Sequence, residues 1–280
     1  MRLTAFFLWL LAFVAQPATA GTSPSLWSLE QHLTSLVAGK SADVGIAALD
    51  LSSGETVSIN GDRAFPMAST MKVAVAAAYL QQVDYGRRSL DDQIAGQPAQ
   101  RLIERMLIYS DNGATDILIR NLGGPDAIQQ WVRWHGFSNL RVDRTIAQLL
   151  RSPRDLWDAR DSATPMAMVE LLRRIDSGKV LKPGSRVYLL STMSRCNTGK
   201  NRMRALLPAG TRVEHKTGTL SGLTSDVGFI TLPDGRRIAV ALFARGGTDR
   251  PNTLAQAARA IYDGFVAELR APFTGMLRAN

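Results

Sequence analysis

The chain has 280 residues, 45% of them hydrophobic, with three His, one Cys and a formal net charge of +9. This composition suits a folded globular protein and excludes a disordered chain. A single Cys excludes an intramolecular disulfide. Cys196 and the scattered His residues show no metal-ligand spacing, so we expect neither a metal nor an organic cofactor. The positive charges are spread singly along the chain, which argues against nucleic-acid binding.

The first twenty residues have the pattern of a secretory signal. Arg2 is followed by an apolar run over residues 5–14, and Ala-Thr-Ala at 18–20 is typical of a cleavage site. The apolar run is shorter than a membrane span requires. We therefore predict removal of residues 1–20 and a periplasmic or secreted product without a membrane span. Retention of the segment as an anchor is the alternative.

Hydrophobic periodicity then predicts two strand-rich ends around a helical middle. A helix is expected over 24–40, followed by strands over 44–51 and 55–59 around a Ser-Ser-Gly turn. Helices are expected over 70–83, 100–109, 114–121, 126–135, 165–177 and 185–193. Strands return over 211–217, 224–232 and 236–244, with Pro-Asp-Gly at 233–235 as a hairpin turn, before a last helix over 251–269.

This interrupted order predicts an α/β fold. Residues 21–63 and 206–280 would together build an antiparallel sheet, with the helices from the two termini covering one of its faces. Residues 64–205 would form an inserted all-α subdomain against the other face. Pattern alone leaves the strand order open.

Ser69-Thr70-Met71-Lys72 is the first of three short motifs that carry chemistry. One helical turn separates Ser69 from Lys72, so hydroxyl and amine are expected side by side. Serine is a poor nucleophile until a base takes its proton. Lys72 can be that base if burial and a second cation, for which Lys216 is the candidate, lower its pKa. Taken alone, Ser69 has a simpler explanation as a helix cap.

Two further motifs follow in order. Ser110-Asp111-Asn112 stands between two predicted helices, and Lys216-Thr217-Gly218 ends a predicted edge strand. Each has an ordinary alternative, as loop or cap residues in the first case and as a strand end in the second. All three motifs in one chain, in this order and on these elements, favour a site for serine acyl transfer.

The trio is the signature of class A β-lactamases and penicillin-binding proteins, and the chain resembles the class A branch over about residues 24–270. The resemblance implies the β-lactamase-like fold. It implies Ser69, Lys72, Ser110 and Lys216 as catalytic residues, and Asn112, Thr217, Gly218 and Thr219 as substrate contacts. The backbone N–H groups of Ser69 and Thr219 would form the oxyanion hole.

The resemblance breaks inside the Ω-shaped loop that positions the hydrolytic water in class A enzymes. Arg144 and Asp161 match the pair that closes this loop. Ile146 stands where the family's general-base Glu is expected, and Leu150 where its water-positioning Asn is expected. Loss of both groups should slow hydrolysis of the acyl-enzyme far more than its formation.

Three other loop residues offer substitutes. Asp155 or Asp158 could supply a carboxylate, although loop aspartates more often cap turns. Gln148 could orient a water molecule but cannot take its proton.

Further departures concern the surroundings of the site. The interval from Ser69 to Ser110 is shorter than in class A proteins, which predicts a more open cleft. The Arg often found on the strand after Lys-Thr-Gly is absent, and Thr224 and Ser225 lie there instead. His215 is expected either at the rim of the site or on the other side of its strand. Cys196 has no His nearby in the sequence and is expected to be a small buried residue.

These observations predict an exported, monomeric serine hydrolase. It would open β-lactams, or related amides and esters, through a Ser69 acyl-enzyme with impaired deacylation. A penicillin-binding peptidase acting on D-Ala-D-Ala ends is an alternative, and so is a binder that traps one acyl group without turnover. The expected partner is a β-lactam or a peptide-like small molecule, and its physiological identity stays open.

Overall fold

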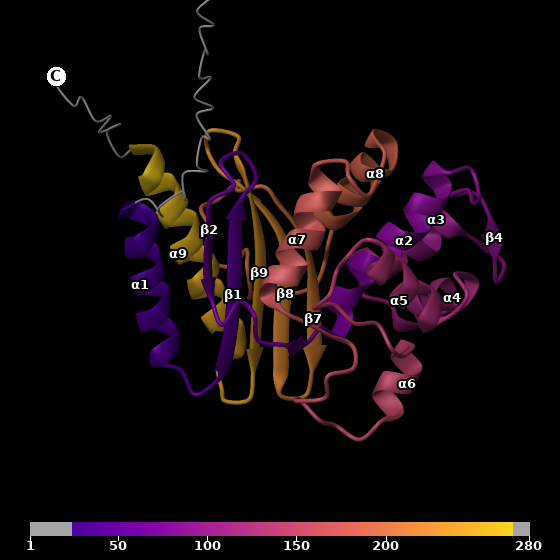
Figure 1. Cartoon of the computed structure of the whole chain (residues 1–280), viewed down its shortest axis with the longest axis horizontal. Coiled ribbons are helices and arrows are strands. Elements are labelled where there is room, and N and C mark those ends of the chain that lie inside the picture. The colour runs from indigo at the N-terminus through magenta and orange to yellow at the C-terminus, as the bar shows by residue number, and fades with distance from the viewer. Residues whose placement is uncertain (1–23, 271–280) are drawn as a thin grey trace, which may run out of the picture.

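A computed structural model describes residues 24–270 as helices packed on both faces of one five-stranded sheet (Figure 1). The strand order is β2-β1-β9-β8-β7 and every pairing is antiparallel. The strands are β1 (Asp43–Asp50), β2 (Thr56–Ile59), β7 (Val213–Leu220), β8 (Leu223–Thr231) and β9 (Arg237–Arg245). Pairing of β1 with β9 joins the two ends of the chain in one sheet, and β7 forms an edge.

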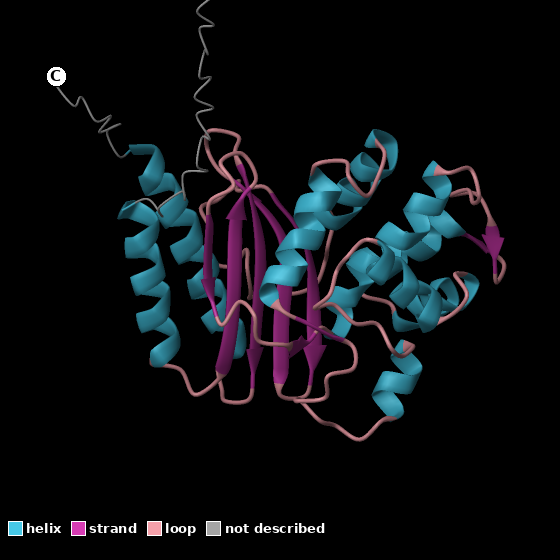
Figure 2. Ribbon diagram, viewed as in Figure 1, coloured by secondary structure: helices cyan, strands magenta, loops and turns pink. Residues whose placement is uncertain are grey.

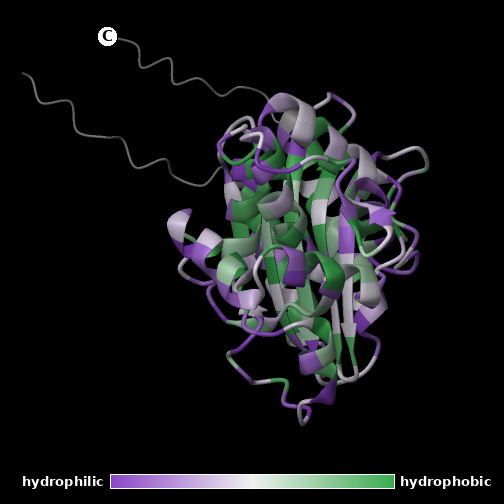
Figure 3. Cartoon of the chain, turned by 90° about the vertical axis from the view of Figure 1, so that its right-hand side faces the viewer, coloured by the Kyte–Doolittle hydropathy of each residue, from purple (hydrophilic) through white to green (hydrophobic). Residues whose placement is uncertain are grey.

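Two terminal helices, α1 (Pro24–Ala38) and α9 (Arg250–Arg270), lie side by side over one face of the sheet (Figure 2). Side chains alternate along β9, as they must in a strand. Val240 and Leu242 belong to the core under these helices, whereas Ala241 and Phe243 belong to the core on the opposite face. The sheet is therefore buried on both faces, and apolar residues gather on its strands in Figure 3.

The opposite face carries α7 (Pro165–Asp176), which packs on β1, β8 and β9. Beyond it lies a helical block around α2 (Lys72–Asp84). Every residue from 72 to 81 is buried, which identifies α2 as the central helix of this block. The surrounding helices are α3 (Ala99–Ile108), α4 (Asn112–Asn121), α5 (Pro125–Trp134) and α8 (Pro183–Ser194).

The sheet and the helical block meet where the 3₁₀ turn η1 (Ala68–Met71) packs against β7. Gly218 makes this contact possible. A Cβ atom at Gly218 would lie 2.6 Å from the Met67 carbonyl oxygen and 3.1 Å from the Ala68 Cβ atom. Packing thus requires a glycine at this position, which the motif alone did not indicate. The close contact brings Ser69 near the Lys-Thr-Gly strand.

The predicted helices and main strands are confirmed, with ends that differ by a few residues. The Lys-Thr-Gly motif lies inside β7 rather than at its end, because the strand continues to Leu220. One helix, α6 (Ile146–Arg151), was not predicted. Four strands of two residues each were also missed, namely β3 (Phe65–Pro66), β4 (Gln93–Ile94), β5 (Gln97–Pro98) and β6 (Ser162–Ala163).

The predicted signal segment lies outside the described residues. Among residues 24–270, no helix is both long and apolar enough to cross a membrane. The boundaries expected near residues 63 and 206 fall between elements, after β2 and between α8 and β7. The division into two subdomains stays a prediction.

Candidate active site

Ser69 lies in η1, the 3₁₀ turn that directly precedes α2. The Lys72 N–H donates to the Ser69 carbonyl oxygen, and the Thr70 N–H donates to the Met67 carbonyl oxygen 3.1 Å away. Ala68 has a φ of +50°, a left-handed conformation that costs a residue with a Cβ atom about 1–2 kcal/mol. The turn is therefore strained next to the candidate nucleophile, whose side chain is partly exposed.

Lys72 is completely buried and lies at the junction of the first two motifs. Its Nζ donates to the Ser110 carbonyl oxygen at 2.7 Å, the Ser110 Oγ at 3.2 Å and the Asn112 Oδ1 at 2.8 Å. None of the hydrogen bonds among the described side chains joins Lys72 to the Ser69 hydroxyl. Catalytic hydrogen bonds are often loose in the free enzyme and tighten when substrate binds.

Lys216 reaches the same hydroxyl from the sheet side. Its Nζ lies 3.0 Å from the Ser110 Oγ and 2.9 Å from the Thr217 carbonyl oxygen, and the side chain is completely buried. Burial, and next to it the charge of Lys216, lower the pKa of Lys72 to about 7. Burial also lowers the pKa of Lys216 to about 8. Burial and a second cation are the two causes that the sequence suggested for a lowered Lys72 pKa.

Ser110 is held in a strained turn between α3 and α4, with a φ of +60°. The Asp111 N–H donates to the Arg105 carbonyl oxygen at 3.1 Å, and the Asp111 carboxylate pairs with the Arg105 guanidinium at 2.5 Å. Asp111 also caps α4, accepting from the Ala114 N–H at 2.9 Å. The middle residue of this motif therefore fixes the turn, which leaves the Ser110 and Asn112 side chains to contact Lys72.

A guanidinium that sequence reasoning missed lies beside β7. Arg202 donates to the carbonyl oxygens of Gly218 at 2.9 Å and Ser225 at 3.1 Å, and to the Thr219 Oγ1 at 2.7 Å. The sequence had indicated that the Arg expected on the next strand is absent. A positive charge nevertheless reaches this end of the motif, from the segment between α8 and β7. No local spacing signals that contact.

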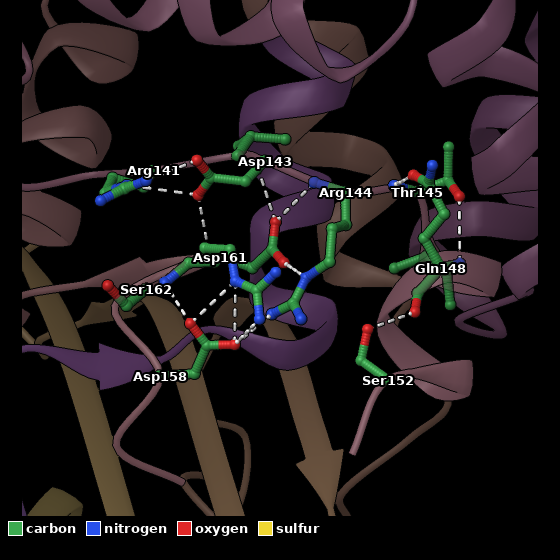
Figure 4. Close-up of polar contacts among 12 residues, drawn as sticks. Arg141, Asp143, Arg144, Thr145, Gln148, Ser152, Asp158, Asp161 and Ser162 are labelled. Atoms are coloured by element: carbon green, nitrogen blue, oxygen red, sulfur yellow. Dashed lines mark hydrogen bonds and ion pairs between the residues drawn. The ribbon is translucent and has the colours of Figure 1, made fainter. Parts of the chain in front are cut away.

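Figure 4 shows the Ω loop, residues 144–161, closed by the pair that the sequence identified. The Asp161 carboxylate accepts from the Arg144 Nε at 2.6 Å, and from the backbone N–H groups of Asp143 at 2.7 Å and Arg144 at 3.0 Å. Both partners of the ion pair are buried. The structure thus brings Arg144 and Asp161 together.

Ile146 is the first residue of α6, and its side chain is buried in the core of the helical block. The buried carboxylate of Asp116 accepts from the Ile146 N–H at 2.7 Å and the Ala147 N–H at 2.9 Å. Asp116 was not singled out from the sequence. Thr145 and Gln148 form a capping box at the start of α6, and this was the available sequence signal for the helix.

The three substitute residues are engaged in holding the loop. Asp158 pairs with Arg160 at 2.8 Å and Arg144 at 3.2 Å, and the hydrogen bond from Arg160 leads the effects that lower the pKa of Asp158 to about 2. Asp155 is exposed and accepts from the Trp157 N–H at 2.8 Å, as expected of a turn cap. The Gln148 Oε1 accepts from the Thr145 N–H at 2.8 Å. Leu150 is 51% exposed.

His215 is completely buried, which excludes the rim of the site, the first of its two expected places. Its Nδ1 lies 2.8 Å from the Asp226 Oδ1 on β8. Cys196 is buried, as predicted, but interacts with His215, which is distant in the sequence and near in space. Among the described side chains, no three or more His, Cys, Asp or Glu are grouped so that they could hold a metal ion.

Comparison with known proteins agrees with this geometry. Residues 28–265 match the model of the β-lactamase enzyme family. The chain is 30% identical to the extended-spectrum β-lactamase PER-1 of Pseudomonas aeruginosa, over 90% of this chain and 91% of that one. It is 31% identical to β-lactamase VEB-1 of the same species, over 77% and 82% of the two chains.

Solved structures agree as well. A β-lactamase from Chitinophaga pinensis superposes with a TM-score of 0.79 at 29% identity, covering 85% of this chain and 99% of that one. A variant of the last common ancestor of class A β-lactamases of Gram-negative bacteria superposes with a TM-score of 0.80 at 32% identity, covering 86% and 99%. With its serine motifs assembled around one buried lysine pair, the chain belongs to the class A β-lactamase family and is a serine hydrolase of that type.

Proposed function

We propose that this family member is an exported enzyme that β-lactams acylate at Ser69 and that releases the acyl group slowly. Two contrasting environments carry the proposal. Lys72 is completely buried beside Ser110 and Asn112, with a pKa near neutrality. Two residues after Arg144, the chain has a buried Ile146 and no carboxylate. The first environment supports acylation, and the second supports a defective hydrolytic step.

In acylation, the Ser69 Oγ attacks the lactam carbonyl carbon while the neutral amine of Lys72 takes the hydroxyl proton. The proton passes through the Ser110 hydroxyl, which both lysines contact, to the lactam nitrogen as the C–N bond breaks. One C–O bond replaces one C–N bond and the proton ends on the leaving nitrogen. We assign the backbone N–H groups of Ser69 and Thr219 to the developing oxyanion.

The carboxylate that β-lactam antibiotics carry beside the ring nitrogen would bind along β7. Lys216 and Arg202 supply positive charge there, and Thr217 and Thr219 supply hydroxyl groups. Arg202 would thus supply the positive charge for the substrate carboxylate that the absent strand arginine does not supply. We assign Asn112, which is exposed next to Lys72, to the amide side chain of the substrate, and Gly218 to close backbone contact.

Slow deacylation follows from the groups near α6. The buried side chain of Ile146 cannot accept a proton, and both carboxylate oxygens of Asp116 are already engaged with backbone N–H groups. Asp158, with a pKa of about 2, is a very weak base at neutral pH. This favours a hydrolase whose acyl-enzyme persists over an efficient β-lactamase. The names of the relatives support β-lactams as the substrate class.

The signal-like pattern of residues 1–20 supports export, and we propose a periplasmic or secreted location. A compartment outside the cytoplasm is where β-lactams and cell-wall peptides are met. Fractionation of cells expressing the full chain, with the N-terminus of the product sequenced, tests this. A product that still begins at Met1 in the cytoplasm would exclude it.

The decisive experiment follows the mass of the intact protein after mixing with excess benzylpenicillin, with Ser69→Ala as the control. We expect an adduct of one drug mass that persists after free drug is removed, and no adduct in Ser69→Ala. Penicillin consumption without an adduct would indicate fast deacylation and contradict the proposed slow step. No adduct and no consumption would overturn the proposal and direct the search to D-Ala-D-Ala peptides. An adduct in Ser69→Ala would exclude Ser69 as the nucleophile.

A further inference from the structure

A buried array of three side chains lies next to the Lys-Thr-Gly strand and takes no part in the proposed reaction. Asp226 and His215 are both completely buried, and the Asp226 Oδ1 lies 2.8 Å from the His215 Nδ1. The other ring nitrogen, Nε2, is buried without a well-formed hydrogen bond to any described residue. The charge of His215 also acts on the thiol of Cys196, which lies just after α8.

The charges around this thiol favour its ionisation. Burial lowers the pKa of His215, but the neighbouring Asp226 raises it by more than burial lowers it. The resulting pKa is about 9, so the ring is positively charged at neutral pH. Burial opposes ionisation of Cys196, but the neighbouring His215, helped by Lys216, lowers the thiol's pKa to about 6. Arg202 is the other charged group that interacts with the thiol.

Two hydroxyl groups connect this thiol to the substrate strand. The Cys196 Sγ lies 3.3 Å from the Thr198 Oγ1, and the Thr198 Oγ1 lies 2.5 Å from the Thr217 Oγ1. Each hydroxyl has one proton to donate. A thiolate can only accept, so ionisation of the sulfur at one end fixes the direction of both hydrogen bonds in the chain.

The two states differ at the Thr217 end. A neutral thiol can donate to Thr198, so that Thr198 donates to Thr217 and the Thr217 proton can be offered to a substrate carboxylate. A thiolate can only accept, so Thr198 donates to sulfur and Thr217 donates to Thr198. In that state Thr217 presents only lone pairs to the cleft, and these repel a substrate carboxylate.

We propose that Cys196 is a positioning residue whose protonation state decides whether Thr217 offers a proton or a lone pair to the substrate carboxylate. The inference rests on the proposed carboxylate site along β7. Carboxylate-bearing β-lactams then bind more tightly to the thiol form, and their binding draws one proton onto Cys196.

The first test is the pH dependence of the dissociation constant of the noncovalent benzylpenicillin complex, from stopped-flow acylation kinetics. We expect binding to weaken about tenfold as the thiol ionises, the usual worth of one hydrogen bond to a charged group. In Cys196→Ser, whose hydroxyl does not ionise, this step should vanish and binding should stay at the tighter level. Thr198→Val, which breaks the chain but leaves the thiol, should also lose the step, and so should the wild-type protein with benzylpenicillin methyl ester.

The second test uses the only cysteine of the chain as its own reporter. In Ser69→Ala, which cannot be acylated, benzylpenicillin binding should decrease the ultraviolet absorbance of the thiolate. Unchanged absorbance in the presence of demonstrated binding, or a binding step near pH 6 that persists in a folded Cys196→Ser, would overturn the inference. If the wild-type protein forms no acyl adduct, it is the proposed function that fails. Equal thermal midpoints for the wild type and Cys196→Ser would exclude a merely structural effect.

Discussion

Two buried ammonium groups converge on one hydroxyl in this site. Lys72 and Lys216 approach the Ser110 Oγ at 3.2 and 3.0 Å, and neither side chain is exposed to solvent. Two cations so close together disfavour each other's charged form, and burial disfavours both. Lys72, with the lower pKa, is the group that loses its proton first. The environment thus eases proton loss from Lys72 more than from Lys216.

The rate of acylation should therefore have a bell-shaped dependence on pH. It should rise as pH increases through about 7, because Lys72 acts as a base only when neutral. It should fall above about 8, because Lys216 then loses the charge that attracts the substrate carboxylate. Stopped-flow measurement of kcat/KM for acylation checks this. Lys216→Arg, whose guanidinium stays charged, should lose the falling limb, and a flat wild-type profile would contradict both assignments.

Ile146→Glu should accelerate release of the acyl group by about 10²-fold, the lower part of the range for a positioned general base. The new carboxylate would stand at the first residue of α6, near the Asp116 carboxylate, and repulsion between them raises its pKa toward neutrality. The measurement is the decay of the adduct mass after free drug is removed. Ile146→Gln is the control, because a Gln side chain has nearly the same shape as Glu but cannot act as a base. Equal acceleration in that control would mean that water access, not base catalysis, had been limiting.

The Ω loop is anchored at both ends of residues 144–161. The Arg144–Asp161 pair closes its ends, and Asp116 holds the start of α6. Near its end, the guanidinium of Arg245 lies 3.4 Å from the centroid of the Trp157 ring and donates to the Leu156 carbonyl oxygen at 3.2 Å. These contacts hold the loop in place although it contains no Glu or Asn.

Arg144→Ala should lower the free energy of unfolding by about 3 kcal/mol, because it leaves a buried carboxylate without its partner. Urea unfolding followed by circular dichroism gives this value. Arg160→Ala is the matched control in the same loop. Its guanidinium is largely exposed in its pair with Asp158, and little change is expected. Equal losses in both variants would argue against a special role for the buried pair.

At the scale of the whole molecule, the site depends on how closely the helical block approaches the edge of the sheet. Ser69, Lys72 and Ser110 come from the block, and Lys216 comes from β7. Gly218 is the point of contact, because a side chain there would meet the Met67 carbonyl oxygen of the block. A small shift at this contact would change the distance between nucleophile and strand.

Gly218→Ala should slow acylation about a hundredfold, the typical result of a displacement near 1 Å in an active site, while the protein remains folded. Gly184→Ala is the control, because Gly184 is exposed in α8 and a Cβ atom there meets nothing within 4 Å. That variant should acylate normally and be slightly more stable. Normal acylation in Gly218→Ala would show that the strand and the turn can separate without cost.

The long helices and strands and the candidate site residues could be predicted because their signals are local, whereas the strand order came from the family resemblance. Periodic apolar residues mark each long helix and strand, and the three motifs place Ser69, Lys72, Ser110 and Lys216 at element ends or on a strand. The α6 helix and the two-residue strands were not predicted, because so few residues show little periodicity. The capping box of Thr145 and Gln148 was nevertheless a visible signal for the start of α6.

The sequence by itself thus determined the α/β plan, the order of the three motifs, the Arg144–Asp161 pair and the lack of a Glu at position 146. Only the tertiary structure decided the contacts between residues far apart in the chain. Asp116 beneath Ile146, Arg202 beside Thr219, and Cys196 beside His215 are examples. The physical reason is that spacing along a chain predicts neighbours only within one element, whereas charges and hydrogen bonds act through space, between elements that packing brings together.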